Sequence, residues 1–250
     1  SKLILAGGTL KTKGETSNYE TYTFPMEVEE GTYSVFAPNR NCYIRNKISG
    51  AGTLEFDIPY VREYFDADLS NFTGKIVAWG KSSESGGSLF LSEKNMNMAN
   101  TRLELKGNAH VCMWPTSGVG SIGGLSGDAG TYLMASSKKT NGVTCSWTIG
   151  GANSDETFNG IINNQACSSG YTAKNNNITK VGTGIWRLTG KNVYVGTTTV
   201  NGGALIINGD QTSATGAYIV NSGATLQGQG IIGGTVTVNS GATLCAGDSL

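Results

Sequence analysis

One short phrase is written three times near the end of this 250-residue chain. "TTVNGGAL" spans residues 198–205, "YIVNSGATL" spans 218–226 and "TVTVNSGATL" spans 235–244. A period of about 20 residues is typical of a solenoid, in which each unit covers the hydrophobic face of its neighbour. The repeat therefore favours a stack of similar units over a fold with one central core.

Within each copy the residues alternate as they do in a β-strand. In the third copy Val236 and Val238 share one face, and the threonines between them share the other. Residues 239–241, Asn-Ser-Gly, supply a bend, because Asn and Gly tolerate positive φ. After the bend Leu244 returns to the inner face. A two-residue period with Thr on the outside predicts strand, turn and strand.

Two or three short strands in about 20 residues fit one coil of a parallel β-helix, with coils stacked about 4.8 Å apart. We therefore predict an all-β, single-stranded parallel β-helix. Asn201, Asn221 and Asn239 occupy matching turn positions in the three copies. Asparagines stacked in this way hydrogen-bond to one another, so we expect a structural ladder along the turn.

Composition limits the classes of function. Gly, Asn, Ser and Thr make up 110 of the 250 residues, which alone would permit disorder. Against disorder, 38% of the residues are hydrophobic, and they fall in short alternating runs. Eighteen basic residues balance eighteen acidic ones, so a nucleic-acid partner is not indicated. No apolar run approaches 18 residues, so we expect no transmembrane segment.

Residues 181–249 carry a family resemblance. "VGTGIWRLTGKNVYVGTTTVNGGALIING" and "VNSGATLQGQGIIGGTVTVNSGATLCAGDS" are similar to the passenger-associated repeat of bacterial autotransporters. Trp186 departs from the family pattern, which usually has Leu there. The resemblance implies a right-handed β-helix, secreted or associated with the outer membrane at a bacterial surface. It also implies a stalk or late-folding scaffold within a longer parent chain that has flanking domains.

The charges divide the chain into two unequal halves. Of the 36 charged residues, 25 lie in residues 1–115 and only four in 181–250. We expect one continuous β-helix over 1–250, with an irregular, loop-bearing part in 1–180 and regular repeats in 181–250. The expected loops lie at 37–47, 57–70, 114–124 and 163–177.

Residues that could bind a metal or perform catalysis are sparse. The five cysteines lie more than 20 residues apart and His110 is the sole histidine, so no zinc site is indicated. We predict no metal and no cofactor, and we expect the cysteines to be buried thiols. Asp66, Asp68 and Ser70 faintly resemble a calcium loop, but the glycine and the closing glutamate of that loop are absent.

Polysaccharide lyases and glycosidases also use β-helices, so an enzyme is the alternative. One acidic cluster with a nearby base exists, formed by Asp57, Arg62, Glu63, Asp66 and Asp68. It lies on a single segment, whereas a catalytic groove would collect its ligands from successive coils. We therefore predict no catalytic residues.

Aromatic side chains could stack on sugar rings. Tyr60, Arg62, Tyr64 and Phe65 combine aromatic and charged groups in a polar segment, and we predict them as binding residues. The tryptophans (Trp79, Trp114, Trp147 and Trp186) are expected to be buried. The sequence thus predicts a non-catalytic structural or adhesive segment, with a polysaccharide or a host or cell-surface ligand as partner. The alternative is a polysaccharide-binding or lyase-like protein.

Overall fold

The structure of this chain is a computed structural model. It describes residues 1–12, 20–38, 42–58, 63–80, 87–92, 97–114, 118–136, 144–165 and 175–247. Within these ranges the ordered elements are β-strands and no helix occurs. Accordingly, this part of the chain holds no helix that could cross a membrane.

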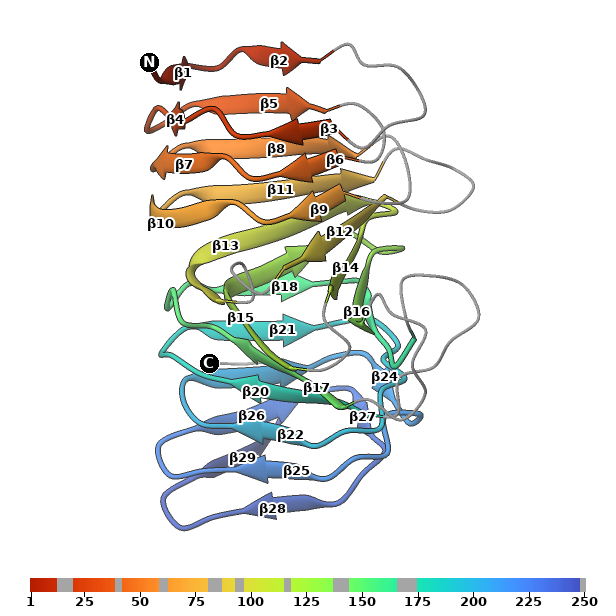
Figure 1. The fold of residues 1–250 in the computed structure, drawn as a ribbon. Coiled ribbons are helices and arrows are strands. Elements are labelled where there is room, and N and C mark those ends of the chain that lie inside the picture. Colours follow the sequence, from red (N-terminus) through yellow and green to blue (C-terminus); the bar gives the residue numbers. More distant parts are fainter. Residues whose placement is uncertain are drawn as a thin grey trace.

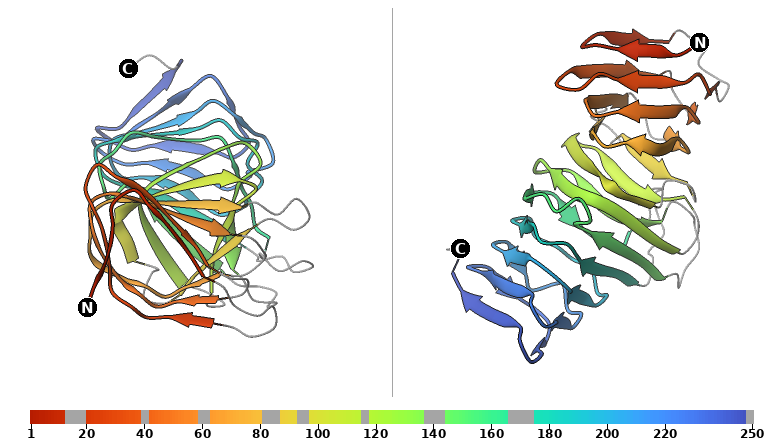
Figure 2. Two further views of the ribbon diagram at one scale, coloured as in Figure 1. Left: turned by 90° about the horizontal axis from the view of Figure 1, so that it is seen from above. Right: turned by 90° about the vertical axis from the view of Figure 1, so that its left-hand side faces the viewer.

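The strands stack in parallel along one axis, from β1 (Leu3–Leu5) at one end to β28 (Val236–Val238) at the other (Figure 1). The two further views show successive coils lying over one another along this axis (Figure 2). The pairings between stacked strands are parallel throughout the described ladders, as between β8 (Thr53–Ile58) and β11 (Lys75–Gly80). This arrangement confirms the predicted all-β parallel solenoid.

The largest sheet, here called the large sheet, has sixteen strands in the described ranges. Its main path runs through β2 (Thr9–Lys11), β5 (Tyr33–Ala37), β8, β11, β13 (Asn97–Gly107), β15 (Gly118–Gly127), β17 (Thr144–Ile149), β20 (Asn175–Lys180), β22 (Thr198–Val200), β25 (Tyr218–Val220) and β28. A second path branches from β15 through β18 (Glu156–Phe158), β21 (Ile185–Leu188), β23 (Ala204–Ile207), β26 (Thr225–Gly228) and β29 (Thr243–Ala246). The branch arises because the long β15 pairs with β17 near its start and with β18 at its end.

Three smaller sheets complete the coils. A short sheet stacks β1, β4 (Met26–Val28), β7 (Lys47–Gly50) and β10 (Asp68–Phe72). A seven-stranded sheet stacks β19 (Ile161–Ile162), β16 (Tyr132–Ser136), β14 (His110–Met113), β12 (Ser88–Leu91), β9 (Glu63–Phe65), β6 (Cys42–Ile44) and β3 (Glu20–Tyr22). A fourth sheet pairs β24 (Asp210–Gln211) with β27 (Ile231–Ile232).

The core follows from the alternation of each strand. In β11 the side chains of Ile76 and Ala78 are fully buried inside the solenoid, while Lys75 and Trp79 point outward. Aromatic rings stack along the interior of the first coils: Phe56 lies 5.8 Å from Phe36, measured between ring centroids, in an edge-on arrangement. Apolar rows of this kind bury one coil against the next, so stability accumulates along the axis.

The tryptophans Trp147 and Trp186 are buried, as expected. The indole Nε1 of Trp186 donates a hydrogen bond to the carbonyl of Leu125, 61 residues earlier in the chain, at 2.9 Å. Trp147 donates to the carbonyl of Met134 at 3.2 Å. Each indole therefore packs in the core with its polar atom satisfied, as a buried tryptophan requires.

The repeated turn forms a ladder. Asn221 donates to Asn201, 20 residues earlier, and Asn239 donates to Asn221, 18 residues earlier. Elsewhere the coils are longer: Ile185 donates its backbone N–H to Asp155, 30 residues earlier. The period of about 20 residues thus holds in the repeats but not in the middle of the chain.

Sequence-based expectations about loops and cysteines need correction. The expected loops 37–47 and 57–70 contain strands, β6 (Cys42–Ile44) and β9 (Glu63–Phe65). The glycine-rich segment 114–124 was predicted as a loop, yet β15 occupies its second half. Its glycines make room for a neighbour, since a Cβ at Gly120 would lie 2.7 Å from the indole of Trp147. The cysteines differ as well: Cys112 is disulfide-bonded and Cys245 is exposed.

Candidate functional site

The outer face of the large sheet carries its most varied chemistry on β5, β8, β11 and β13. Strand register aligns the outward side chains in three rows that run along the solenoid axis. The first row holds Tyr33, Thr53, Lys75 and Arg102, the second Val35, Glu55, Val77 and Glu104, and the third Asp57, Trp79 and Lys106. We call the third set the Trp79 row.

Charges in the centre of this face neutralise one another. Lys75 Nζ lies 2.6 Å from Glu104 Oε2, and Lys106 Nζ lies 3.4 Å from Glu104 Oε1. Partial burial works to raise the pKa of Glu104, but the two ammonium groups outweigh it and hold that pKa below its usual range. Val77 lies in the second row, between Glu55 and Glu104, and its side chain is fully buried although it is on the outer face. The centre of this face is therefore a packed layer in which Lys75 and Lys106 both pair with Glu104.

Tyr33 extends this layer toward the N-terminal end. Its ring is 44% exposed, while its hydroxyl donates a hydrogen bond to the carboxylate of Glu55. Glu55 itself is only 3% exposed. Burial and the adjacent carboxylate together raise the pKa of the Tyr33 phenol, so this group stays protonated.

Trp79 lies near the end of β11. Its side chain is 37% exposed, so the expectation that it would be buried is wrong. The strand alternation accounts for this, because Trp79 shares the outward face of β11 with Lys75. Beneath the indole lies Gly107, where a Cβ would come within 3.2 Å of Trp79 Cδ1 and Nε1. Lys106 Nζ lies 5.9 Å from the ring centroid, within cation–π range.

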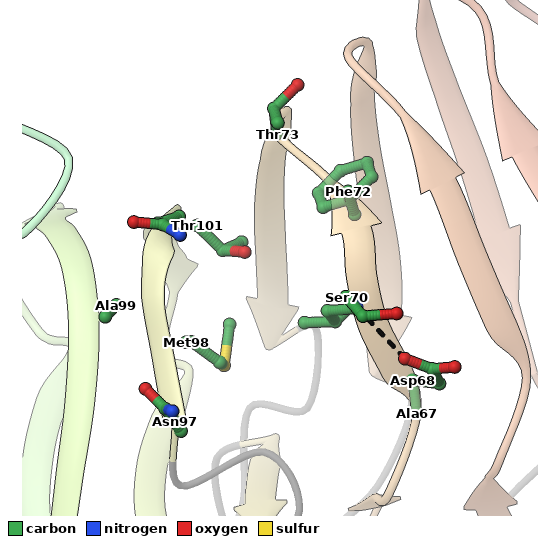
Figure 3. Close-up of a pocket in the computed structure, with 11 residues that line it drawn as sticks. Ala67, Asp68, Ser70, Phe72, Thr73, Asn97, Met98, Ala99 and Thr101 are labelled. Atoms are coloured by element: carbon green, nitrogen blue, oxygen red, sulfur yellow. Dashed lines mark hydrogen bonds between the residues drawn. The ribbon is translucent and has the colours of Figure 1, made fainter.

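A cleft opens beside this face, between β10 and the start of β13 (Figure 3). β10 is the last strand of the short sheet, while Asn97 and Met98 pair onward with β15, so neither strand pairs with the other here. The cleft has a volume of about 570 Å³. Its lining combines hydroxyl, amide and carboxylate groups with three buried apolar side chains, Ala67, Phe72 and Met98.

Two of the four predicted binding residues, Tyr64 and Phe65, lie in the described part of the chain, and they face opposite sides of β9. Tyr60 and Arg62 lie outside the described residues. Phe65 is fully buried and its ring lies 5.2 Å from that of Phe56 inside the solenoid. Tyr64, 6% exposed, faces the other side of β9, where its ring stacks on Tyr43 with centroids 4.6 Å apart. Neither ring is exposed to a ligand, because both pack against other aromatic rings. The polar sequence around them did not indicate this packing.

Two members of the predicted acidic cluster, Asp66 and Asp68, make contacts within the described residues. Asp66 accepts a hydrogen bond from Ser92 Oγ at 2.5 Å and pairs with Arg45 Nε at 3.3 Å. Asp68 accepts the backbone N–H of Ser70 at 3.0 Å, closing a turn (Figure 3). In the ranges that the structure describes, no three His, Cys, Asp or Glu side chains come together as metal ligands.

Comparison with known proteins adds a decisive observation for the regular coils. Residues 178–207 match the Passenger-associated-transport-repeat family model. The match covers β21, β22 and β23 and the turn at Asn201, where the coils become regular. The passenger-associated repeat is therefore built here as stacked strands joined by an asparagine-bearing turn.

A relative carries a similar segment. The adhesin BmaC autotransporter of Brucella suis biovar 1 (strain 1330) is 51% identical over 55 residues. These residues are 22% of this chain and only 2% of the relative's length. The passenger-associated repeat and this relative indicate a bacterial protein that is secreted or displayed at the cell surface, as the sequence predicted.

Sequence reasoning missed the Trp79 row. The alternation in "KIVAWG" places Trp79 on the same face as Lys75, and this signal could have predicted its exposure. The juxtaposition with Asp57 and Lys106 could not be predicted, because it depends on how coils of unequal length align.

Proposed function

We propose that this chain is a non-catalytic segment of a bacterial surface passenger, a stiff rod that presents an adhesive face. The observation that carries the proposal is the passenger-associated repeat over residues 178–207, set on coils that continue the same sheet as the charged face. The rod would belong to a longer, outer-membrane-associated parent chain with flanking domains. One continuous solenoid, irregular over 1–180 and regular over 181–250, is part of this proposal.

The regular coils suit a scaffold. Their backbone hydrogen bonds run along the axis, and their inner residues repeat from coil to coil, as in the Leu205, Leu226 and Leu244 row. Few charges interrupt them, and Asn201, Asn221 and Asn239 continue the ladder along the turn. Such coils stiffen a spacer and offer few groups for chemistry.

The described side chains also support a non-catalytic role. His110 is half-buried beside Tyr132, with ring centroids 4.9 Å apart, and this partial burial lowers its pKa. The lowered pKa favours the neutral imidazole, and its Nδ1 has no hydrogen-bond partner among the described residues, so no carboxylate there orients it as a catalytic base. The carboxylates of Asp66 and Glu104 are held by ion pairs.

An attachment assay tests the adhesive part. Latex beads coated with the purified chain should attach to cultured epithelial cells more than albumin-coated beads, and soluble chain should compete. Attachment no greater than that of albumin beads would refute adhesion. The non-catalytic part is tested by incubating the chain with soluble polysaccharides, whose viscosity and reducing-end content should stay constant. A steady release of reducing ends, or of unsaturated products absorbing near the ultraviolet, would show an enzyme instead.

A further inference from the structure

The parallel ladder of the solenoid is interrupted at the cleft between β10 and β13 (Figure 3). The short sheet ends at β10, which pairs with no later strand among the described residues. In the next coil β13 continues both positions: residues 102–107 pair with β11, while Asn97 and Met98 pair onward with β15. Residues 97–101 therefore lie opposite β10 without pairing with it. One rung of the ladder is open at this place.

Strand edges form the two sides of this cleft. The backbone N–H groups of Asp68 and Thr73 donate to carbonyl groups of the preceding coil, so one edge of β10 is paired. Its other edge faces the cleft, and an edge strand presents a row of N–H and C=O groups at the spacing of another strand. The N–H of Ser70 already donates to Asp68 Oδ1 at 3.0 Å. A ligand would therefore use the other backbone groups of β10 and those of residues 97–101.

The side chains of the cleft divide as those of a strand do. Phe72 and Met98 belong to the core of the solenoid, and each is only 2% exposed. Ser70, Asn97 and Asn100 also line the cleft, and they are exposed. A strand bound here would direct alternate side chains at the core and the others at solvent. Because Phe72 and Met98 are already packed, the side chains that point inward must be small.

The lining favours a peptide over other ligands. None of its eleven residues is Lys, Arg or His, so an anionic group would find no basic partner. Its aromatic ring, that of Phe72, is buried, so it offers no exposed ring on which a sugar could stack. What the cleft offers is backbone on two sides, and an extended peptide pairs with such edges through its own N–H and C=O groups.

We propose that this cleft binds an extended peptide of a partner protein, which adds a strand between β10 and residues 97–101. The bound segment alternates small residues, such as Gly, Ala or Ser, with polar ones. About five of its residues lie in the cleft, because β10 has five residues. Main-chain hydrogen bonds supply the affinity, and the small inward positions supply the specificity. This inference deepens the adhesive role proposed above by naming the class of its partner, and it rests on that role.

Fluorescence polarisation with the purified chain tests the site. The probes are fluorescein-labelled eight-residue peptides that alternate Thr with Ala, Ser, Leu or Phe. We expect the Ala and Ser peptides to bind, and the Phe peptide to bind at least tenfold more weakly. An Ala peptide that is N-methylated at alternate residues keeps its side chains but loses backbone donors, so its affinity should also fall tenfold or more.

Two variants of the chain carry the same added bulk. Ser70→Trp places an indole in the cleft and should weaken binding of the Ala peptide tenfold or more. Val119→Trp is the matched control, because Val119 is 62% exposed on β15 and lies outside the lining, and it should bind as the unaltered chain does. Circular dichroism would check that both variants fold.

Hydrogen exchange of the unaltered chain locates the bound peptide without any variant. Backbone amides in residues 69–73 and 97–101 should exchange more slowly when the Ala peptide is present. Three results would overturn the proposal: no binding by the Ala and Ser peptides, equal affinity for the N-methylated peptide, or protection confined to other strands. Retardation of the chain in a gel that contains mannan, if Ser70→Trp removes it, would make the cleft a glycan site instead.

The bead assay separates this inference from the adhesive role. Beads that attach to cells, coated with a chain that binds neither the Ala nor the Ser peptide, would leave adhesion standing and remove the peptide site. A chain that binds the Ala peptide in the cleft, on beads that fail to attach, would keep the peptide site and remove cell adhesion.

Discussion

Asn221 donates a hydrogen bond through Nδ2 to Oδ1 of Asn201 at 2.6 Å, linking the turns of two stacked coils. Its own Oδ1 accepts the equivalent bond from Asn239 at 2.7 Å. The middle asparagine therefore makes two ladder bonds, while each outer one makes one. Because the number of bonds differs, the three asparagines should contribute unequally to the stability of the fold.

Asn221→Ala should lower the free energy of unfolding by about 1–3 kcal/mol, because two side-chain hydrogen bonds are lost and each contributes about 0.5–1.5 kcal/mol. Asn239→Ala should cost about half as much, since it removes one bond. Urea denaturation followed by circular dichroism would measure both. Equal effects for the two variants would show that the ladder does not act as a chain of pairwise bonds.

Close stacking of glycines also stabilises the regular coils. A Cβ at Gly216 would lie 1.9 Å from the carbonyl oxygen of Gly196 on the preceding coil. Gly216→Ala should therefore destabilise the chain by about 3 kcal/mol or more, as overpacking against rigid backbone does. Gly8→Ala is the control, because nothing lies within 4 Å of its added Cβ, and its effect should stay within about 0.5 kcal/mol. Similar melting temperatures for the two variants would contradict the close approach.

Lys180 is a buried cation at a turn. Its Nζ donates to the carbonyl oxygens of Val181 at 2.7 Å, Gly182 at 3.3 Å and Gly202 at 3.2 Å. Burial lowers its pKa from 10.5 to about 8, although the charge of Asp155 opposes the shift. Three carbonyl partners thus hold an amine that begins to lose its proton near physiological pH.

The lowered pKa predicts how stability depends on pH. Below pH 8 the lysine is protonated in both the folded and the unfolded chain, so its contribution is constant. Between pH 8 and about 10 the unfolded chain binds more protons than the folded one at this site, so stability should rise with pH. Above pH 10 the buried phenols of Tyr194 and Tyr218, whose pKa values are raised, should reverse the trend.

Urea midpoints at pH 7, 8.5 and 9.5 would measure this dependence. The unaltered chain should gain stability relative to Lys180→Met across that series, since the methionine variant lacks the titrating amine but fills similar space. Parallel pH profiles for the two proteins would exclude the proposed titration of Lys180.

The cysteines should react in a defined order. Cys245 is exposed, whereas Cys42 and Cys145 are fully buried, and burial raises the pKa of the Cys145 thiol to about 11. A colorimetric thiol reagent should therefore modify Cys245 in the native chain and reach Cys42 and Cys145 only in denaturant. Cys112 should react only after a reductant is added, because it is disulfide-bonded. Rapid modification of Cys145 in the native chain would show that its coil opens.

The solenoid could be predicted because the sequence patterns that specify it lie within short stretches of the chain. A two-residue alternation and a bend at Asn239 are readable within ten residues, and the same phrase recurs at a fixed spacing. Tyr218 and Val220, one coil earlier, are indeed buried at the inner positions. Val238 is 40% exposed, because no further coil covers β28 in the part of the chain that the structure describes.

The candidate site could not be predicted in the same way. Tyr64 and Phe65 lie in a polar segment, yet both rings pack, one against Tyr43 and one inside the core. Nothing within their own segment indicates those partners: Tyr43 lies 21 residues before Tyr64, and Phe56 lies on β8, nine residues before Phe65. Glycine-rich β15 was hidden as well, because its glycines accommodate Trp147 and not a turn.

By itself, the sequence determined the strand period, the bend and the stacking repeat, since each depends on residues close together in the chain. The tertiary structure alone decided which outward side chains become neighbours. Asp57, Trp79 and Lys106 come from three coils whose lengths the repeat does not set, and only the register of the parallel strands places them side by side. Backbone hydrogen bonds between coils fix that register, and through it the order of the side chains on the outer face.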